Sequence, residues 1–124
     1  MSQSPRQLVI LVGHCGPDEW MIRSSASRSL PEATVEVAHS DAELSRLVEP
    51  GCLCLLNRVL DGDFKETHGQ ALIRELIEGG SRAMLVSNFE EAQTDAVAAG
   101  ALPGFGKAAI NEAETAERLQ GAFQ

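Results

Sequence analysis

The chain has 124 residues, of which 44% are hydrophobic and 23% are charged, and this size and composition predict one domain that buries a core of its own. Ten lysines and arginines against 18 aspartates and glutamates give a formal net charge of -8. The basic residues are scattered, which argues against direct binding to nucleic acid or to an anionic membrane surface. The apolar runs fall far short of the roughly 20 residues that cross a bilayer, and Met1–Arg6 lacks the pattern of a secretory leader, so we expect a cytoplasmic protein.

The first half of the sequence alternates between strand and helix patterns. Residues 7–12 form an apolar run rich in branched side chains, which predicts a strand covered on both faces. A helix that begins with a proline follows over residues 17–30. Residues 33–38 alternate between apolar and polar side chains, as is typical of a half-exposed or edge strand. Ser40 and Glu43 then make a capping-box pattern that begins a short helix.

The second half repeats this alternation. Residues 52–56 are fully apolar and predict a central strand, and a long polar loop follows over residues 57–67. Residues 69–77 carry an apolar stripe at helical spacing. A third apolar strand over residues 82–86 then leads into an alanine-rich helix over residues 90–99.

A fifth strand and a fifth helix complete the pattern. Residues 101–106 make a weak strand because they contain Gly and Pro, and Asn111, with Glu114 three residues later, predicts the N-cap of a helix that runs to about Ala122. Five strand-helix repeats imply parallel strands joined by right-handed crossovers, with helices on both faces. The expected fold class is therefore α/β, a single-domain (βα)5 doubly wound parallel sheet of five strands over residues 1–124.

In such sheets ligands bind at the carboxyl ends of the strands, near the point where the strand order reverses. Four segments are expected at this edge: 13–16, 57–63, 87–89 and 106–108.

The three cysteines do not form a disulfide framework, since their number is odd and the chain is long. Cys52 and Cys54 alternate within one strand, so both should point to one face and be buried as small hydrophobic side chains. Cys15 instead follows a strand and precedes a helix, where the helix dipole favours a thiolate.

Several residues at the carboxyl edge match a known family. Residues 99–101 read Ala-Gly-Ala, Lys107 follows the last strand, Ser87 ends the preceding one, and His68-Gly69 opens the third helix. In these features the sequence resembles the receiver domain of response regulators of bacterial two-component signal transduction, which has a flavodoxin-like fold. The resemblance covers nearly the whole chain and implies a signalling module in a phosphorelay rather than an enzyme.

The chain departs from the family at the centre of its chemistry. The position of the family's phosphoacceptor aspartate is Asn57, and an amide cannot act as the carboxylate nucleophile. The family's acidic pair, which holds Mg²⁺, falls on Gly13, His14 and Cys15, which are poor substitutes for hard oxygen ligands. The resemblance therefore implies a degenerate pseudo-receiver that has no metal or cofactor and acts through protein-protein interaction.

The remaining site residues need new partners in such a module. Lys107 lacks its usual carboxylate, so we expect it to pair with Asn57, Asp61 or Asp63, or to reach solvent. Ser87 is expected to hydrogen-bond Lys107 or a helix N-terminus.

The last strand also differs from the family. Gly104 stands where the family has the aromatic that reports activation, and Phe105 should point to the other face of the sheet unless the strand register shifts.

Two other functions remain open. Cys15 could serve a small phosphocarrier or redox protein, although Pro17 and Asp18 replace the small residues that would present N–H groups to a phosphate. Alternatively, a phosphoryl group could be taken at Asp61 or Asp63 in the long loop. A metal site made of His14, Cys15 and His68 lacks dense ligand spacing and is not expected.

By resemblance, a protein partner would bind a face made of the fourth helix, fifth strand and fifth helix, which we call the output face, over Glu90–Phe123. The fourth helix offers several small or apolar residues: Ala92, Ala96, Val97, Ala98 and Ala99. The same segment carries six carboxylates: Glu90, Glu91, Asp95, Glu112, Glu114 and Glu117. Their charge favours a basic partner, and a homodimer through this face would have to overcome repulsion.

Overall fold

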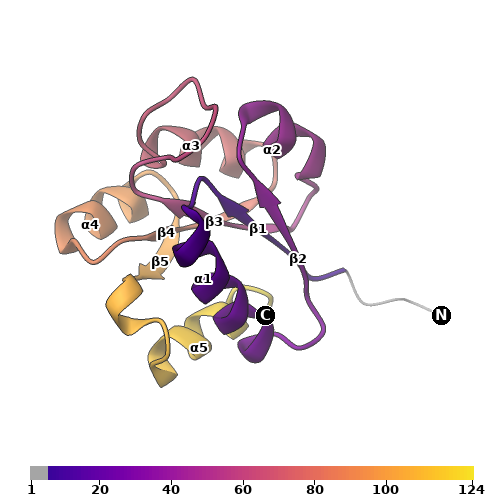
Figure 1. Cartoon of the computed structure of the whole chain (residues 1–124), viewed down its shortest axis with the longest axis vertical. Coiled ribbons are helices and arrows are strands. Elements are labelled where there is room, and N and C mark those ends of the chain that lie inside the picture. Colours follow the sequence, from indigo (N-terminus) through magenta and orange to yellow (C-terminus); the bar gives the residue numbers. More distant parts are fainter. Residues whose placement is uncertain (1–5) are drawn as a thin grey trace.

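Five strands and five α-helices alternate along residues 6–124, which are the residues described by a computed structural model (Figure 1). Two predictions, that the chain lacks a secretory leader and that the domain begins at residue 1, fall on residues 1–5, which lie outside the described part. The elements are β1 Leu8–Val12, α1 Gly16–Ser29, β2 Thr34–Ala38, α2 Asp41–Leu47, β3 Leu53–Asn57, α3 Gln70–Glu78, β4 Arg82–Val86, α4 Glu90–Ala98, β5 Leu102–Phe105, the 3-10 helix η1 Lys107–Ala109 and α5 Ala113–Gly121.

The strands form one parallel sheet in the order β2-β1-β3-β4-β5. The predicted fold class is thereby confirmed, and this strand order is the flavodoxin-like one. β3 lies at the centre and is buried. β2 is an edge strand with partly exposed residues, as its alternating pattern predicts. The order reverses between β1 and β3, so a crevice is expected beyond the ends of these two strands.

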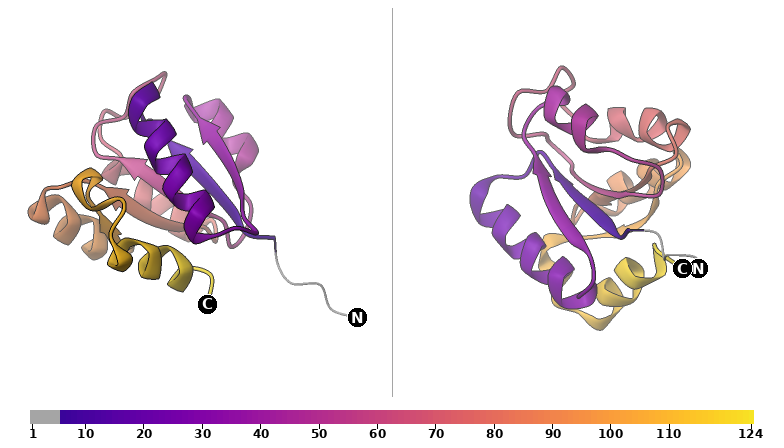
Figure 2. Two further views of the ribbon diagram at one scale, coloured as in Figure 1. Left: turned by 60° about the horizontal axis from the view of Figure 1, so that its bottom comes forward. Right: turned by 90° about the vertical axis from the view of Figure 1, so that its right-hand side faces the viewer.

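Helices cover both faces of the sheet (Figure 2). On one face α1 and α5 lie against each other and pack on a cluster that includes Val9, Leu11 and Leu55. On the other face α2, α3 and α4 pack on a cluster that includes Ile10 and Leu56. Alternate residues of each central strand therefore belong to opposite cores, which explains why these strands are continuously apolar.

The cysteine pair of the third strand is buried as predicted. Cys52 and Cys54 both belong to the core under α2, α3 and α4. The Cys52 thiol donates to the Ser81 hydroxyl at 3.3 Å. The neighbouring Cys52 thiol and burial raise the pKa of Cys54 well above its usual value, so Cys54 stays protonated and serves as packing.

The structure confirms one helix cap and corrects another. Ser40 Oγ accepts from the Glu43 N–H at 3.1 Å and begins α2 as the capping box predicts. The predicted cap at Asn111 is wrong, because η1 delays the start of α5 and makes Glu112 its N-cap. The Asn111 side chain instead accepts from Arg28 Nη2 at 2.6 Å and ties α1 to the start of α5.

An irregularity in the strand pairing shapes the last strand. Met84 pairs with Leu102 but Val86 pairs with Phe105, so β5 carries one extra residue. The Gln93 side chain of α4 lies against this bulge, donating to Leu85 O at 2.8 Å and accepting from the Gly104 N–H at 3.1 Å. The strand register thus shifts at this point, and Phe105 packs in the core under α1 and α5.

None of the helices within residues 6–124 is long and apolar enough to span a membrane. The longest, α1, has 14 residues.

Gly104 should tolerate no side chain, because a Cβ there would lie 2.1 Å from Leu85 O and 2.9 Å from Gln93 Oε1. We expect Gly104→Ala to lower the free energy of unfolding by about 2 kcal/mol, as overpacking does. Gly121→Ala is the matched control, since a Cβ there meets nothing within 4 Å and alanine favours the helix by roughly 0.5 to 1 kcal/mol. Urea unfolding of both variants measures the difference, and equal effects would mean that the bulge is not tightly closed.

Candidate functional site

The predicted site residues gather at the carboxyl edge of the sheet because the strands that precede them are parallel neighbours. His14 and Cys15 follow β1, Asn57 ends β3, Ser87 follows β4, and Lys107 follows β5. His14 and Asn57 lie at the carboxyl ends of β1 and β3, the neighbouring strands between which the order reverses.

The Asn57 side chain is hydrogen-bonded to the backbone. Its Nδ2 donates to the Gly13 carbonyl oxygen at 3.0 Å, and the Asp61 N–H donates to the same oxygen at 2.9 Å. A carbonyl oxygen can face only a donor, so the amide nitrogen and not the amide oxygen points toward Gly13. An aspartate at this position would place a carboxylate oxygen against the Gly13 oxygen, which is repulsive.

His14 is buried and neutral. Only 1% of its surface is exposed, and its Nε2 lies 2.8 Å from Leu55 O, which requires the proton to be on Nε2. Nδ1 is therefore an unprotonated acceptor, and it is buried without a hydrogen-bond partner. Burial lowers the pKa of His14 from 6.5 to about 4, so this side chain carries no charge at neutral pH.

Lys107 has a partner that the sequence analysis did not name. Its Nζ lies 2.6 Å from the Asp18 carboxylate, in the first turn of α1, and both side chains are partly exposed. The hydrogen bond with Lys107 lowers the pKa of Asp18. The predicted pairing of Lys107 with Asn57, Asp61 or Asp63 is wrong, because α1 carries Asp18 to the carboxyl edge beside η1.

Cys15 is the N-cap of α1. Its backbone carbonyl accepts from the Glu19 N–H at 2.8 Å, while its partly exposed thiol makes no capping bond. The first turn of the helix carries Asp18 and Glu19, which pair with Lys107 and with His39. The cysteine chemistry predicted as an alternative for Cys15 stays a prediction.

Ser87 and Asn88 hold the turns after β4 and β5. Ser87 is buried, and its Oγ accepts from the N–H of Phe89, the N-cap of α4, at 3.1 Å. This is the helix N-terminus role predicted as one of two alternatives. Asn88 Oδ1 accepts from the Ala108 N–H at 3.1 Å and fixes the turn beside Lys107.

The long loop after β3 is anchored through its backbone. The Asp61 N–H binds Gly13 O, and the Asp63 N–H donates to His39 O at 2.8 Å. An antiparallel bridge between Val59 and His68 closes the loop. Asp61 and Asp63 themselves are exposed, so their carboxylates lie in solvent while their backbone holds the loop against β1 and β2.

Metal ligands do not converge in the part of the chain that is described, since no three His, Cys, Asp or Glu side chains there form a group that could hold an ion. His68 lies exposed on the loop, whereas His14 is buried.

Three side chains important to the site were not named as such from the sequence. Asp18 neutralises Lys107, Asn88 holds the turn after β5, and Gln93 fills the β5 bulge. The position of Asp18 three residues after Cys15, in the first turn of a predicted helix, was a usable signal. Nothing in the local sequence marks Gln93 or Asn88.

No protein-family model matches the sequence, and neither does any curated protein. Solved structures do resemble it. The signal receiver domain of a DNA-binding response regulator from Colwellia psychrerythraea 34H is 16% identical, with a TM-score of 0.69 over 94% of this chain and 97% of that one. The beryllofluoride-activated NtrC4 receiver domain dimer is 20% identical, with a TM-score of 0.67 over 94% of this chain and 95% of that one.

The signal receiver domain of the response regulator NarL from Mycobacterium tuberculosis is also similar, with 19% identity and a TM-score of 0.60 over 94% of each chain. At these identities the likeness establishes the fold, which is that of receiver domains.

The depressed pKa of His14 makes stability depend on pH. The unfolded chain takes up a proton near pH 6.5 and the folded chain only near pH 4, so stability contributed by neutral His14 is lost as the pH falls from about 6.5 to 4. A shift of this size corresponds to about 3 kcal/mol. We expect His14→Gln to make the free energy of unfolding less dependent on pH between about 4 and 6.5, as measured by urea unfolding. The control His68→Gln, at an exposed residue, should leave this pH dependence unchanged.

Proposed function

We propose that this protein is a receiver-like signalling module that binds a protein partner and does not take a phosphoryl group from a histidine kinase. In this proposal it is a pseudo-receiver, with the receiver fold and without phosphoacceptor chemistry.

The observation that carries the proposal is the hydrogen bond from Asn57 Nδ2 to Gly13 O. The residue at the end of β3 is an amide by sequence, and its donor is used to join β3 to β1. A carboxylate is both the nucleophile and a metal ligand in acyl-phosphate chemistry. Here the same position supplies neither role, and its replacement by aspartate would break a structural bond.

The surroundings of Asn57 support the same proposal. The Lys107 ammonium is already neutralised by Asp18 at 2.6 Å, so it has no unpaired charge to offer a phosphoryl oxygen. His14 is neutral and supplies no hard oxygen to Mg²⁺. On β5, Gly104 lies too close to Leu85 O to carry the aromatic that the family uses.

For the partner we propose the output face, Glu90–Phe123. Val97 and Ala98 are exposed on α4. Ala96 is buried against the sheet, and Ala92 and Ala99 pack partly against the same core. The apolar part of this helix that a partner could reach is therefore smaller than its composition suggests.

Charge is the stronger feature of the output face. All six of its predicted carboxylates are exposed: Glu90, Glu91, Asp95, Glu112, Glu114 and Glu117. Of these six carboxylates, within residues 6–124, only that of Glu114 forms an ion pair, with Arg118. A basic protein surface is the partner that this field favours.

Treatment with acetyl phosphate and Mg²⁺ tests the proposal. We expect no increase in intact mass, and no change in the amide spectrum on addition of beryllofluoride. Asn57→Asp should not restore either response, because the acidic pair after β1 is still absent, and it should lower stability by about 1 to 3 kcal/mol since the Gly13 oxygen loses a donor.

A phosphoryl group on the wild-type protein would contradict the proposal. If it is lost in base and disappears in Asp61→Asn or Asp63→Asn, the acceptor is the loop. If it disappears in Cys15→Ser instead, the protein is a cysteine phosphocarrier.

The charge of the output face predicts how any self-association through it depends on salt. Like charges repel less when screened, so a dimer through this face should tighten when salt is raised from about 0.05 to 0.5 M. Sedimentation equilibrium at the two concentrations measures this. A dimer that is tighter at low salt would have to use another surface.

A further inference from the structure

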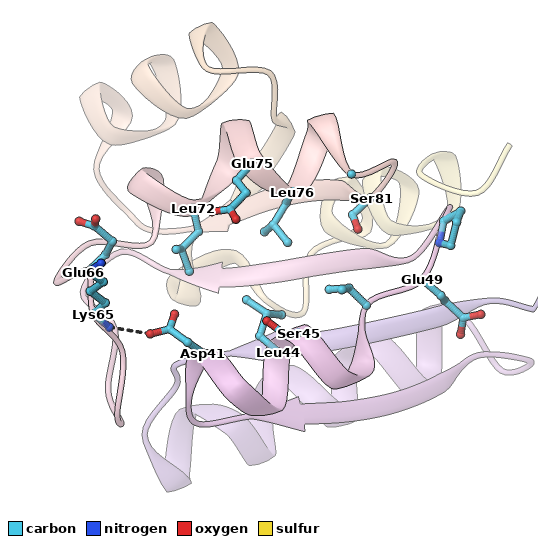
Figure 3. Close-up of a pocket in the computed structure, with 13 residues that line it drawn as sticks. Asp41, Leu44, Ser45, Glu49, Lys65, Glu66, Leu72, Glu75, Leu76 and Ser81 are labelled. Atoms are coloured by element: carbon cyan, nitrogen blue, oxygen red, sulfur yellow. Dashed lines mark hydrogen bonds between the residues drawn. The ribbon is translucent and has the colours of Figure 1, made fainter.

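A groove separates α2 from α3 on the face opposite α1 and α5 (Figure 3). α2 packs on β1 and β2, whereas α3 packs on β4, so the two helices diverge over the sheet. The space between them has a volume of about 710 Å³. Neither Asn57 nor Lys107 lines it.

The floor of the groove is apolar. Leu44 of α2 and Leu72 and Leu76 of α3 project into the space between the helices (Figure 3). Each is almost completely buried, with 7% to 9% of its surface exposed, so an occupant would rest on the edge of the core. Val48 adds a partly buried side chain at the end of α2.

The rim of the groove is acidic. Four carboxylates line it, from Asp41, Glu49, Glu66 and Glu75, against one ammonium, from Lys65. Asp41 accepts from the Lys65 backbone N–H at 2.7 Å, and Glu49 forms an exposed pair with Arg6 at 3.3 Å, which contributes little. Glu66 and Glu75 are exposed on opposite flanks of Leu72.

We propose that this groove, the α2–α3 groove, binds a basic amphipathic helix of a protein partner. Two helices with an apolar floor between them accept a third helix that presents residues at i, i+3, i+4 and i+7. The acidic rim is complementary to lysines or arginines that flank such a stripe. α3 has nine residues, which is about 13 Å of helix, so the matching segment is about two and a half turns long.

A second copy of the chain does not fit this groove as well. The formal net charge is -8, which opposes self-association. The exposed apolar residues of α1, Trp20 and Met21, lie next to Glu19 and near Asp18, so this helix would bring carboxylates to an acidic rim. A foreign helix with positive flanks meets both requirements, apolar contact and opposite charge.

Fluorescence anisotropy with a labelled 14-residue probe tests the proposal. The probe has four leucines at i, i+3, i+4 and i+7 and lysines at most other positions. A second peptide with the same composition and scrambled leucines controls for charge alone. We expect the first to bind at least tenfold more tightly than the second, and binding to weaken as salt is raised.

Matched charge reversals locate the binding. Glu75→Lys, on the rim, and Glu32→Lys, exposed in the turn after α1 and outside both the groove and the output face, change the net charge equally. We expect Glu75→Lys to weaken binding about tenfold and Glu32→Lys to weaken it less than twofold. Ser45→Trp should also abolish binding, since Ser45 is exposed and lines the groove. Thermal unfolding of each variant establishes that it is folded.

Equal losses in the two lysine variants, or amide shifts on the output face instead of α2 and α3, would overturn the proposal. So would dissociation of a wild-type dimer by Ser45→Trp, because the occupant would then be a second copy. The proposal does not rest on the absence of phosphorylation, and its failure would leave the acetyl phosphate result unaffected.

Discussion

The backbone of Gly13 links the segments that form the carboxyl edge of the sheet. Its N–H donates to Ala38 O at 3.1 Å at the end of β2, and its carbonyl accepts from Asn57 and Asp61. The residue adopts a φ of 71°, and a Cβ there would lie 2.7 Å from the Leu60 side chain, so only glycine fits. The ends of three strands and the start of the long loop thus depend on one residue, to which the Asn57 amide is hydrogen-bonded.

The fold could be predicted almost completely because its signals are local. The five-residue apolar strands, the capping box and the alanine-rich helix could each be predicted from their own residues. Because strands and helices alternate regularly, few topologies are then possible. The wrong prediction of an N-cap at Asn111 shows the limit of prediction from local residues. η1 inserts a turn between β5 and α5, and no residue near Asn111 predicts it.

The candidate site was predicted in position but only partly in its contacts. Strand ends identify which residues meet, yet which side chain binds which depends on packing between distant segments. Lys107 and Asp18 are 89 residues apart, and their pairing requires α1 to cross beside η1. The contacts of Gln93 could not be predicted either, because they arise from one extra residue in β5. The absence of a carboxylate at Asn57, by contrast, is plain in the sequence itself.

Gln93 has a consequence for how a signal could pass through the output face. Its side chain joins α4 to both β4 and β5, so α4 cannot slide along the sheet without losing these bonds together. A ligand shifts an equilibrium between two arrangements only by binding them unequally. Under the proposed function, a partner that moved α4 along the sheet would therefore have to bind the displaced arrangement more tightly by at least the free energy of the lost Gln93 hydrogen bonds.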